Sequence, residues 1–67
     1  MKKAVVIGGS GFIGSHVADK LSDVNYSVTV FDRVHSRWLR QDQEMVIGDI
    51  QDADALDSAI EGADVVY

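Results

Sequence analysis

The chain has 67 residues, a net charge of −5 and no cysteine, with 46% hydrophobic and 25% charged residues. This composition is typical of a single globular unit, and the lack of cysteine excludes a disulfide framework or a thiolate metal site. The acidic balance disfavours nucleic acid and anionic membrane surfaces as partners. Glycines interrupt the apolar run near the N-terminus, which disfavours a signal peptide or a membrane span. We therefore expect a cytoplasmic protein.

The first half of the sequence predicts strand, turn, helix, strand and loop. The unbroken apolar run at 4–7 is typical of a strand buried on both faces, and the glycines that follow predict a turn. Apolar residues at helical spacing, from Ile13 to Val24, predict a helix. Residues 27–32 are β-branched and aromatic and predict a second strand. The polar stretch 33–43 predicts a loop, with or without a short helix.

The second half predicts strand, helix and strand. Residues 45–47 read as a third buried strand, closed by Gly48 and Asp49. Asp52 is expected to cap a second helix, with Gly62 near its end. Residues 65–67 open a fourth strand. This order predicts an α/β protein, the N-terminal part of a doubly wound parallel-sheet (Rossmann) domain. Because the sequence stops inside a strand expected to be central, we expect 1–67 to be a fragment that lacks the catalytic and substrate parts.

A glycine-rich turn joins the first strand to the first helix. Read from Gly8 its spacing is G-x-x-G-x-x-G, and read from Gly9 it is G-x-G-x-x-G. Gly8 allows the backbone to fold over, Gly11 leaves room for a pyrophosphate, and Gly14 allows close packing of the helix. The helix N-terminus offers N–H groups to the phosphates. The alternative is a flexible turn that binds nothing, but a strand before the motif and a helix after it favour dinucleotide binding.

Asp32 ends the second strand 18 residues after Gly14, near the position expected for the acid that holds the adenosine ribose. Its carboxylate would accept hydrogen bonds from the ribose hydroxyls and repel a 2′-phosphate. The position favours NAD over NADP. Arg33 leaves an alternative open, because its guanidinium could pair with that phosphate.

Residues 6–16 (Val-Ile-Gly-Gly-Ser-Gly-Phe-Ile-Gly-Ser-His) resemble the opening of the NAD-dependent epimerase/dehydratase family, the extended short-chain dehydrogenase/reductases. Asp32 and the segment 48–52 match further motifs of that family, although Ile7 replaces its common threonine. The resemblance implies that the turn meets the pyrophosphate, Asp32 holds the ribose, and Asp49 accepts from the adenine amino group. Without the resemblance, Asp49 would be interpreted as a turn residue at the end of the strand. The implied cofactor-binding set is Gly8, Ser10, Gly11, Phe12, Ile13, Gly14, Asp32, Arg33, Asp49 and Ile50.

Catalytic residues are not assignable within this chain. The family transfers hydride with a Tyr-x-x-x-Lys pair, but Tyr26 is followed four residues later by Val30, and Tyr67 is the last residue. His16 and His35 have no partner at metal-ligand spacing, so no metal site is expected. The resemblance implies a parent enzyme that acts on a nucleotide sugar or another small molecule, inactive as this segment alone.

Two alternatives stay open. The first is a non-catalytic NAD(P)-binding module that senses the nicotinamide redox state. The second is a short chain that assembles into a homo-oligomer through its exposed strands.

Overall fold

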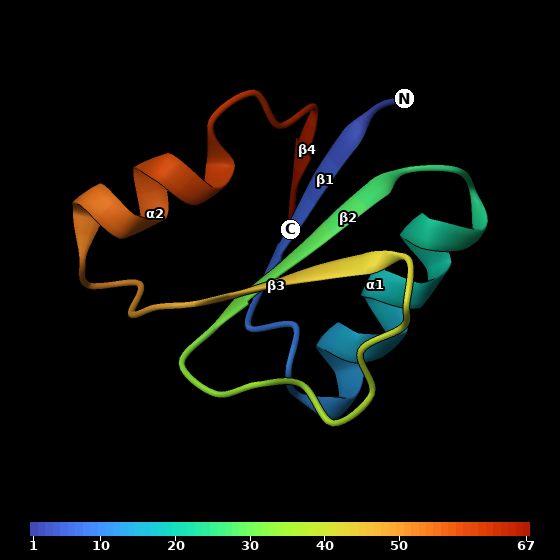
Figure 1. Cartoon of the computed structure of the whole chain (residues 1–67), viewed down its shortest axis with the longest axis horizontal. Coiled ribbons are helices and arrows are strands. Elements are labelled where there is room, and N and C mark those ends of the chain that lie inside the picture. The colour runs from blue at the N-terminus through green and yellow to red at the C-terminus, as the bar shows by residue number, and fades with distance from the viewer.

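All four predicted strands form, and they join one parallel sheet in the order β3-β2-β1-β4 (Figure 1). The computed structural model describes residues 1–67. Its elements are β1 (Lys3–Ile7), α1 (Phe12–Asp23), β2 (Ser27–Asp32), β3 (Gln43–Ile47), α2 (Ala53–Ile60) and β4 (Val65–Val66). The α/β class and the parallel topology predicted from the sequence are confirmed.

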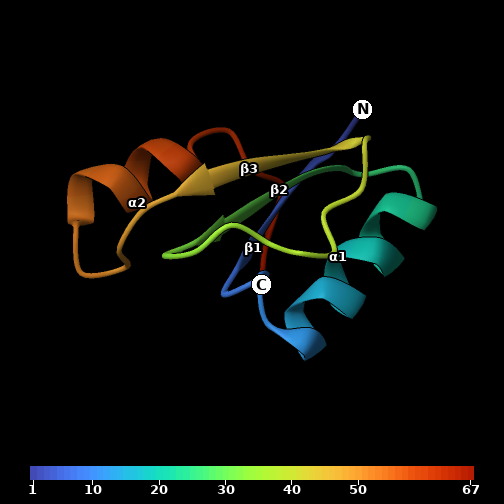
Figure 2. The ribbon, with the colours of Figure 1, turned by 60° about the horizontal axis from the view of Figure 1, so that its bottom comes forward.

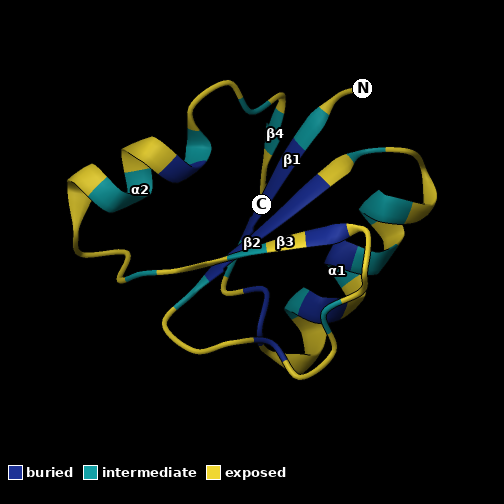
Figure 3. Ribbon diagram, in the orientation of Figure 1, coloured by how far each residue is buried: buried dark blue, intermediate teal, exposed yellow.

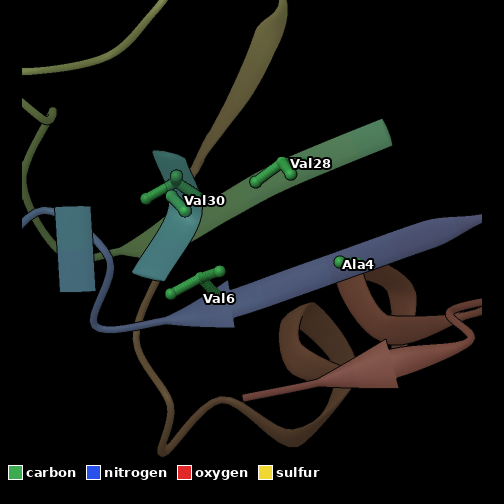
Figure 4. Close-up of a cluster of buried hydrophobic side chains, with 5 residues drawn as sticks. Ala4, Val6, Val28 and Val30 are labelled. Carbon is green, nitrogen blue, oxygen red and sulfur yellow. The ribbon is translucent and has the colours of Figure 1, made fainter. Parts of the chain in front are cut away.

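The two helices cover opposite faces of the sheet (Figure 2). Side chains alternate along a strand, so β1 sends Ala4 and Val6 to the α1 face and Val5 to the α2 face. The α1 face gathers Ala4, Val6, Val28 and Val30 from the two central strands (Figure 4). The continuous apolar runs of β1 and β2 reflect this cover on both sides, as expected for a parallel sheet.

Burial is concentrated in β1, β2 and the inner side of α1 (Figure 3). The largest fully buried side chain is Phe31 in β2, which packs on the α2 face with Val5 and Ala59. Both helices fall short of the length and apolar character that crossing a bilayer requires.

Local signals that were predicted at the helix ends are present. The Asp52 carboxylate accepts a hydrogen bond from the Ala55 N–H at 3.2 Å and so caps α2. Gly62, just beyond α2, has φ +74°, a conformation that a side chain would disfavour. After α1 the same left-handed region is filled by Asn25, with φ 70°.

The prediction that β3 is buried is wrong. β3 forms one edge of the sheet and pairs only with β2, and the side chains that it presents to the two faces are poorly covered: Val46 and Ile47 are 37% and 60% exposed. The strand also begins earlier than expected, at Gln43, which is buried. The Gln43 amide donates to Asp19 and Ser22 of α1, at 3.1 and 3.0 Å, and this anchors the start of β3 to that helix.

The connection from β2 to β3 contains turns and bends but no helix. It is held at its far end by Arg40, which forms ion pairs with Asp19 at 3.1 Å and Asp23 at 2.8 Å. The hydrogen bond to Asp23 raises the pKa of Arg40 above its ordinary value. The crossover between the two parallel strands is therefore an irregular segment pinned to α1.

Candidate functional site

The glycine turn lies at the carboxyl end of β1, beside the carboxyl end of β2. Gly8 has φ +76°, which confirms that the chain reverses there through a conformation suited to glycine. The Gly8 N–H donates to the Phe31 carbonyl at 2.8 Å, which ties the turn to the adjacent strand. In doubly wound sheets, ligands bind in the crevice outside the carboxyl ends of the strands, so this end of the sheet is the candidate site.

The first turn of α1 presents unpaired donors to this crevice. The helix begins at Phe12 with Gly11 as N-cap, and no side chain caps it. The N–H groups of Phe12, Ile13 and Gly14 donate to no protein acceptor, whereas the Ser15 N–H donates to the Gly11 carbonyl at 2.8 Å. No acidic side chain lies in the first turn. A helix end of this kind suits a phosphate, through its free N–H groups and its partial positive charge.

Gly11 and Gly14 differ in what surrounds them. A Cβ added at Gly14 would lie 2.5 Å from the Gly8 carbonyl oxygen and 2.7 Å from the Gly9 Cα, so Gly14 permits close packing of α1 against the turn. A Cβ at Gly11 would meet no protein atom closer than 3.6 Å. The space over Gly11 is left open by the protein, which fits the close approach of a pyrophosphate to the main chain.

Asp32 is held in a fixed orientation at the end of β2. Its Oδ2 accepts from the Ser10 N–H at 3.0 Å, and its Oδ1 accepts from the Arg33 N–H at 2.6 Å. Each carboxylate oxygen has a second lone pair, and the residue is only partly buried. The group can therefore accept hydrogen bonds from two neighbouring hydroxyls, as an adenosine ribose would present them.

The three non-glycine members of the expected cofactor-binding set in the glycine motif differ in how their side chains are placed. The Ser10 side chain is buried and donates to the Val34 carbonyl at 2.6 Å instead of facing the helix N-terminus. Phe12 and Ile13 are 65% and 73% exposed. The Ser10 N–H already donates to Asp32, and the side chains of Phe12 and Ile13 are apolar, so any phosphate contact from Phe12 and Ile13 would come from their main chain.

The remaining three expected residues lie on exposed loops beside Asp32. The Gly48 N–H donates to the Asp32 carbonyl at 2.9 Å, so the end of β3 lies next to Asp32. Asp49 follows, and its Oδ1 accepts from the Gln51 N–H at 2.9 Å, which is the turn role that the sequence also allowed. Arg33, Asp49 and Ile50 are all exposed, and their adenine contacts stay predictions.

Sequence reasoning missed two packing features of the site. A Cβ at Gly48 would lie 2.8 Å from the Phe31 ring, so the turn after β3 sits directly on the main core aromatic. Phe12 also packs edge-on against His16, with ring centroids 4.6 Å apart, and against Trp38 at 6.0 Å. The position of Phe12 and His16 one turn apart on a helix is the signal that could have indicated the first contact.

The model of the NAD dependent epimerase/dehydratase family matches residues 4–67. The mouse (Mus musculus) sterol-4-alpha-carboxylate 3-dehydrogenase, decarboxylating, is 38% identical over 66 residues, which cover 98% of this chain and 18% of that protein. A putative UDP-glucose 4-epimerase of Methanocaldococcus jannaschii is 42% identical over 64 residues, and the match covers 91% of this chain and 21% of that protein.

Among solved structures, UDP-glucose 4-epimerase from Brucella ovis in complex with NAD superposes with a TM-score of 0.88 at 34% identity. The match covers 98% of this chain and 22% of that one. The chain thus spans about a fifth of the length of these relatives.

Proposed function

Because the chain belongs to the NAD dependent epimerase/dehydratase family, we propose that it forms the cofactor-holding part of an oxidoreductase acting on nucleotide sugars. The observation that carries the proposal is the pairing of an uncapped helix N-terminus with an oriented Asp32 carboxylate at one end of the sheet. The first suits a pyrophosphate and the second suits a ribose, and a dinucleotide carries both groups.

The nicotinamide, when bound, supplies the acceptor for a hydride from a secondary alcohol carbon of the substrate. The residues of this chain bind and orient the cofactor. The N–H groups of Phe12 and Ile13 hold the pyrophosphate, Asp32 holds the adenosine ribose, and Asp49 lies on the adenine side. The catalytic pair lies outside residues 1–67 in this proposal, so the segment alone is inactive.

NAD is the proposed cofactor in preference to NADP. A 2′-phosphate would bring negative charge against the Asp32 carboxylate, whose two oxygens are already fixed by the N–H groups of Ser10 and Arg33. The carboxylate has no salt bridge, so its charge is not neutralised by a cation. Arg33 is exposed, and its side chain forms no hydrogen bond or ion pair that would fix it over a phosphate.

The nucleotide-sugar substrate is supported by relatives named as UDP-glucose 4-epimerases. A second candidate, a sterol bearing a secondary alcohol, is favoured by the mouse relative, which is named as a sterol dehydrogenase. Both substrates would lose a hydride from a carbinol carbon, so the proposed role of this chain is the same for each. The redox-sensing alternative is not favoured, because these relatives are named as enzymes.

The test uses the complete natural protein that contains these residues. NADH and NADPH are titrated by nicotinamide fluorescence, and turnover is then followed with UDP-glucose and with a 3-hydroxysterol. We expect NADH to bind more tightly than NADPH, and UDP-glucose to be converted. Absence of NADH binding up to about 1 mM, the upper range of common substrate constants, would overturn the cofactor assignment. Turnover of the sterol but not of UDP-glucose would show that the substrate is a sterol and not a nucleotide sugar.

A further inference from the structure

Ser10 forms two hydrogen bonds to β2 and the segment that follows it. Its main-chain N–H donates to Asp32 Oδ2 at 3.0 Å, and its Oγ donates to the Val34 carbonyl at 2.6 Å. The residue is 8% exposed, so these bonds are shielded from competing water. One small residue of the phosphate-binding turn thus contacts both sides of Arg33.

The segment after Asp32 depends on few other contacts near its start. Ser36, at 3% exposed, is its next buried residue, and the Ser36 Oγ accepts from the Trp38 N–H at 3.2 Å. Val34 and His35 are exposed. The Ser10 hydroxyl is therefore the side-chain bond that fixes the backbone between Asp32 and Ser36 to the rest of the protein.

We infer that Ser10 is a positioning residue for the adenosine half of the cofactor. It holds the Asp32 carboxylate through its N–H and the backbone at Val34 through its hydroxyl, so that the ribose meets a preset acceptor. The inference rests on the proposed function, because it assigns a role within that cofactor site. Ser10 itself touches no cofactor atom in this arrangement, since its hydroxyl is directed to Val34.

Loss of the hydroxyl should act on ribose recognition more than on phosphate binding. In Ser10→Ala the N–H to Asp32 remains, but the Val34 carbonyl loses its donor, so the backbone next to Asp32 relaxes. One neutral hydrogen bond corresponds to a change of about 3- to 10-fold in affinity. NADPH gains little from the Asp32 carboxylate, so its affinity should change less than that of NADH.

The experiment compares Ser10→Ala with Ser58→Ala, which changes an exposed serine on α2 whose side chain forms no hydrogen bond within the protein. Both are made in the complete protein, and NADH, NADPH and ADP-ribose are titrated. The same Ser10 change is also made in an Asp32→Ala background. We expect Ser10→Ala to lower the affinities for NADH and ADP-ribose about 3- to 10-fold and to reduce the ratio of NADH affinity to NADPH affinity. In the Asp32→Ala background, the same change should lower the NADH affinity by less than about 2-fold.

Equal weakening of NADH and NADPH, or the same loss in the Asp32→Ala background, would overturn the inference, because both indicate general loosening of the turn. If Ser10→Ala does not fold, Ser10→Cys keeps a weak donor of similar size and should lie between the wild type and the expected alanine values. A wild-type protein that binds no NADH would refute the proposed function, whereas normal NADH binding by Ser10→Ala would refute only the role of Ser10.

Discussion

Gly14→Ala should destabilise the protein through a clash within the backbone. The new Cβ would lie 2.5 Å from the Gly8 carbonyl oxygen and 2.7 Å from the Gly9 Cα, and neither atom can move aside as a flexible side chain would. Overpacking of this kind lowers the free energy of unfolding by up to about 3 kcal/mol, while the higher helix propensity of alanine over glycine raises it by about 1 kcal/mol. We expect the free energy of unfolding, measured by urea denaturation, to fall by about 2 kcal/mol.

Gly11→Ala is the matched comparison, three residues away in the same glycine motif. Its Cβ would meet no protein atom closer than 3.6 Å, and Gly11 has φ −74°, so alanine fits without strain. The free energy of unfolding should stay within about 1 kcal/mol of the wild type. The methyl group would occupy the space over which the pyrophosphate approaches, so the NADH affinity should fall at least about tenfold in a fluorescence titration.

The pair of variants separates packing from binding. A Gly14→Ala protein as stable as the wild type would show that the turn adjusts, and that close packing of α1 does not require glycine there. Normal NADH affinity in Gly11→Ala would show that the cofactor does not pass over this residue. Either result would refute the corresponding part of the site described above.

Three further predictions concern single residues. Asp32→Asn should lower the NADH affinity about tenfold and reduce the ratio of NADH affinity to NADPH affinity in competition titrations, because charge-assisted hydrogen bonds to the ribose are lost. An unchanged ratio of the two affinities would contradict this. Asp52→Ala should lower the free energy of unfolding by about 1 kcal/mol in urea, since the Ala55 N–H loses its cap. Gly62→Ala should lower the free energy of unfolding by about 1–2 kcal/mol in the same assay. The backbone conformation at φ +74° is the cause, because an added Cβ there meets no atom within 4 Å. Gly62→Asn, which tolerates this conformation better, should recover part of that loss.

Local sequence signals predicted most of the fold and two conformational features of the candidate site. The apolar runs located β1 and β2, and helical spacing located α1 and α2. The position of Asp32 at the end of a strand and the need for glycine at position 8 are both confirmed by the structure. These features depend on residues close together in the chain, so a short window of sequence contains the information.

The features that were missed depend on neighbours distant in sequence. The hydropathy of Met45, Val46 and Ile47 indicates a strand but does not say that β3 lies at an edge, where only one strand pairs with it. The short helix allowed within 33–43 does not form. The hydroxyl of Ser10 bonds a carbonyl 24 residues away, and no spacing rule selects that partner.

The central position of β1 has a consequence for the order in which the protein is made. β1 pairs with β2 on one side and with β4 on the other, and the Lys3 N–H bonds to the Asp64 carboxylate across 61 residues of sequence. During synthesis at about 5–20 residues per second, one edge of β1 therefore stays open for roughly 3–12 s before its partner is made. Of the two strands that pair on both edges, β2 has its second partner once β3 is made, whereas β1 waits for β4. The β1–β4 contact should therefore be among the late steps in the folding of this sheet.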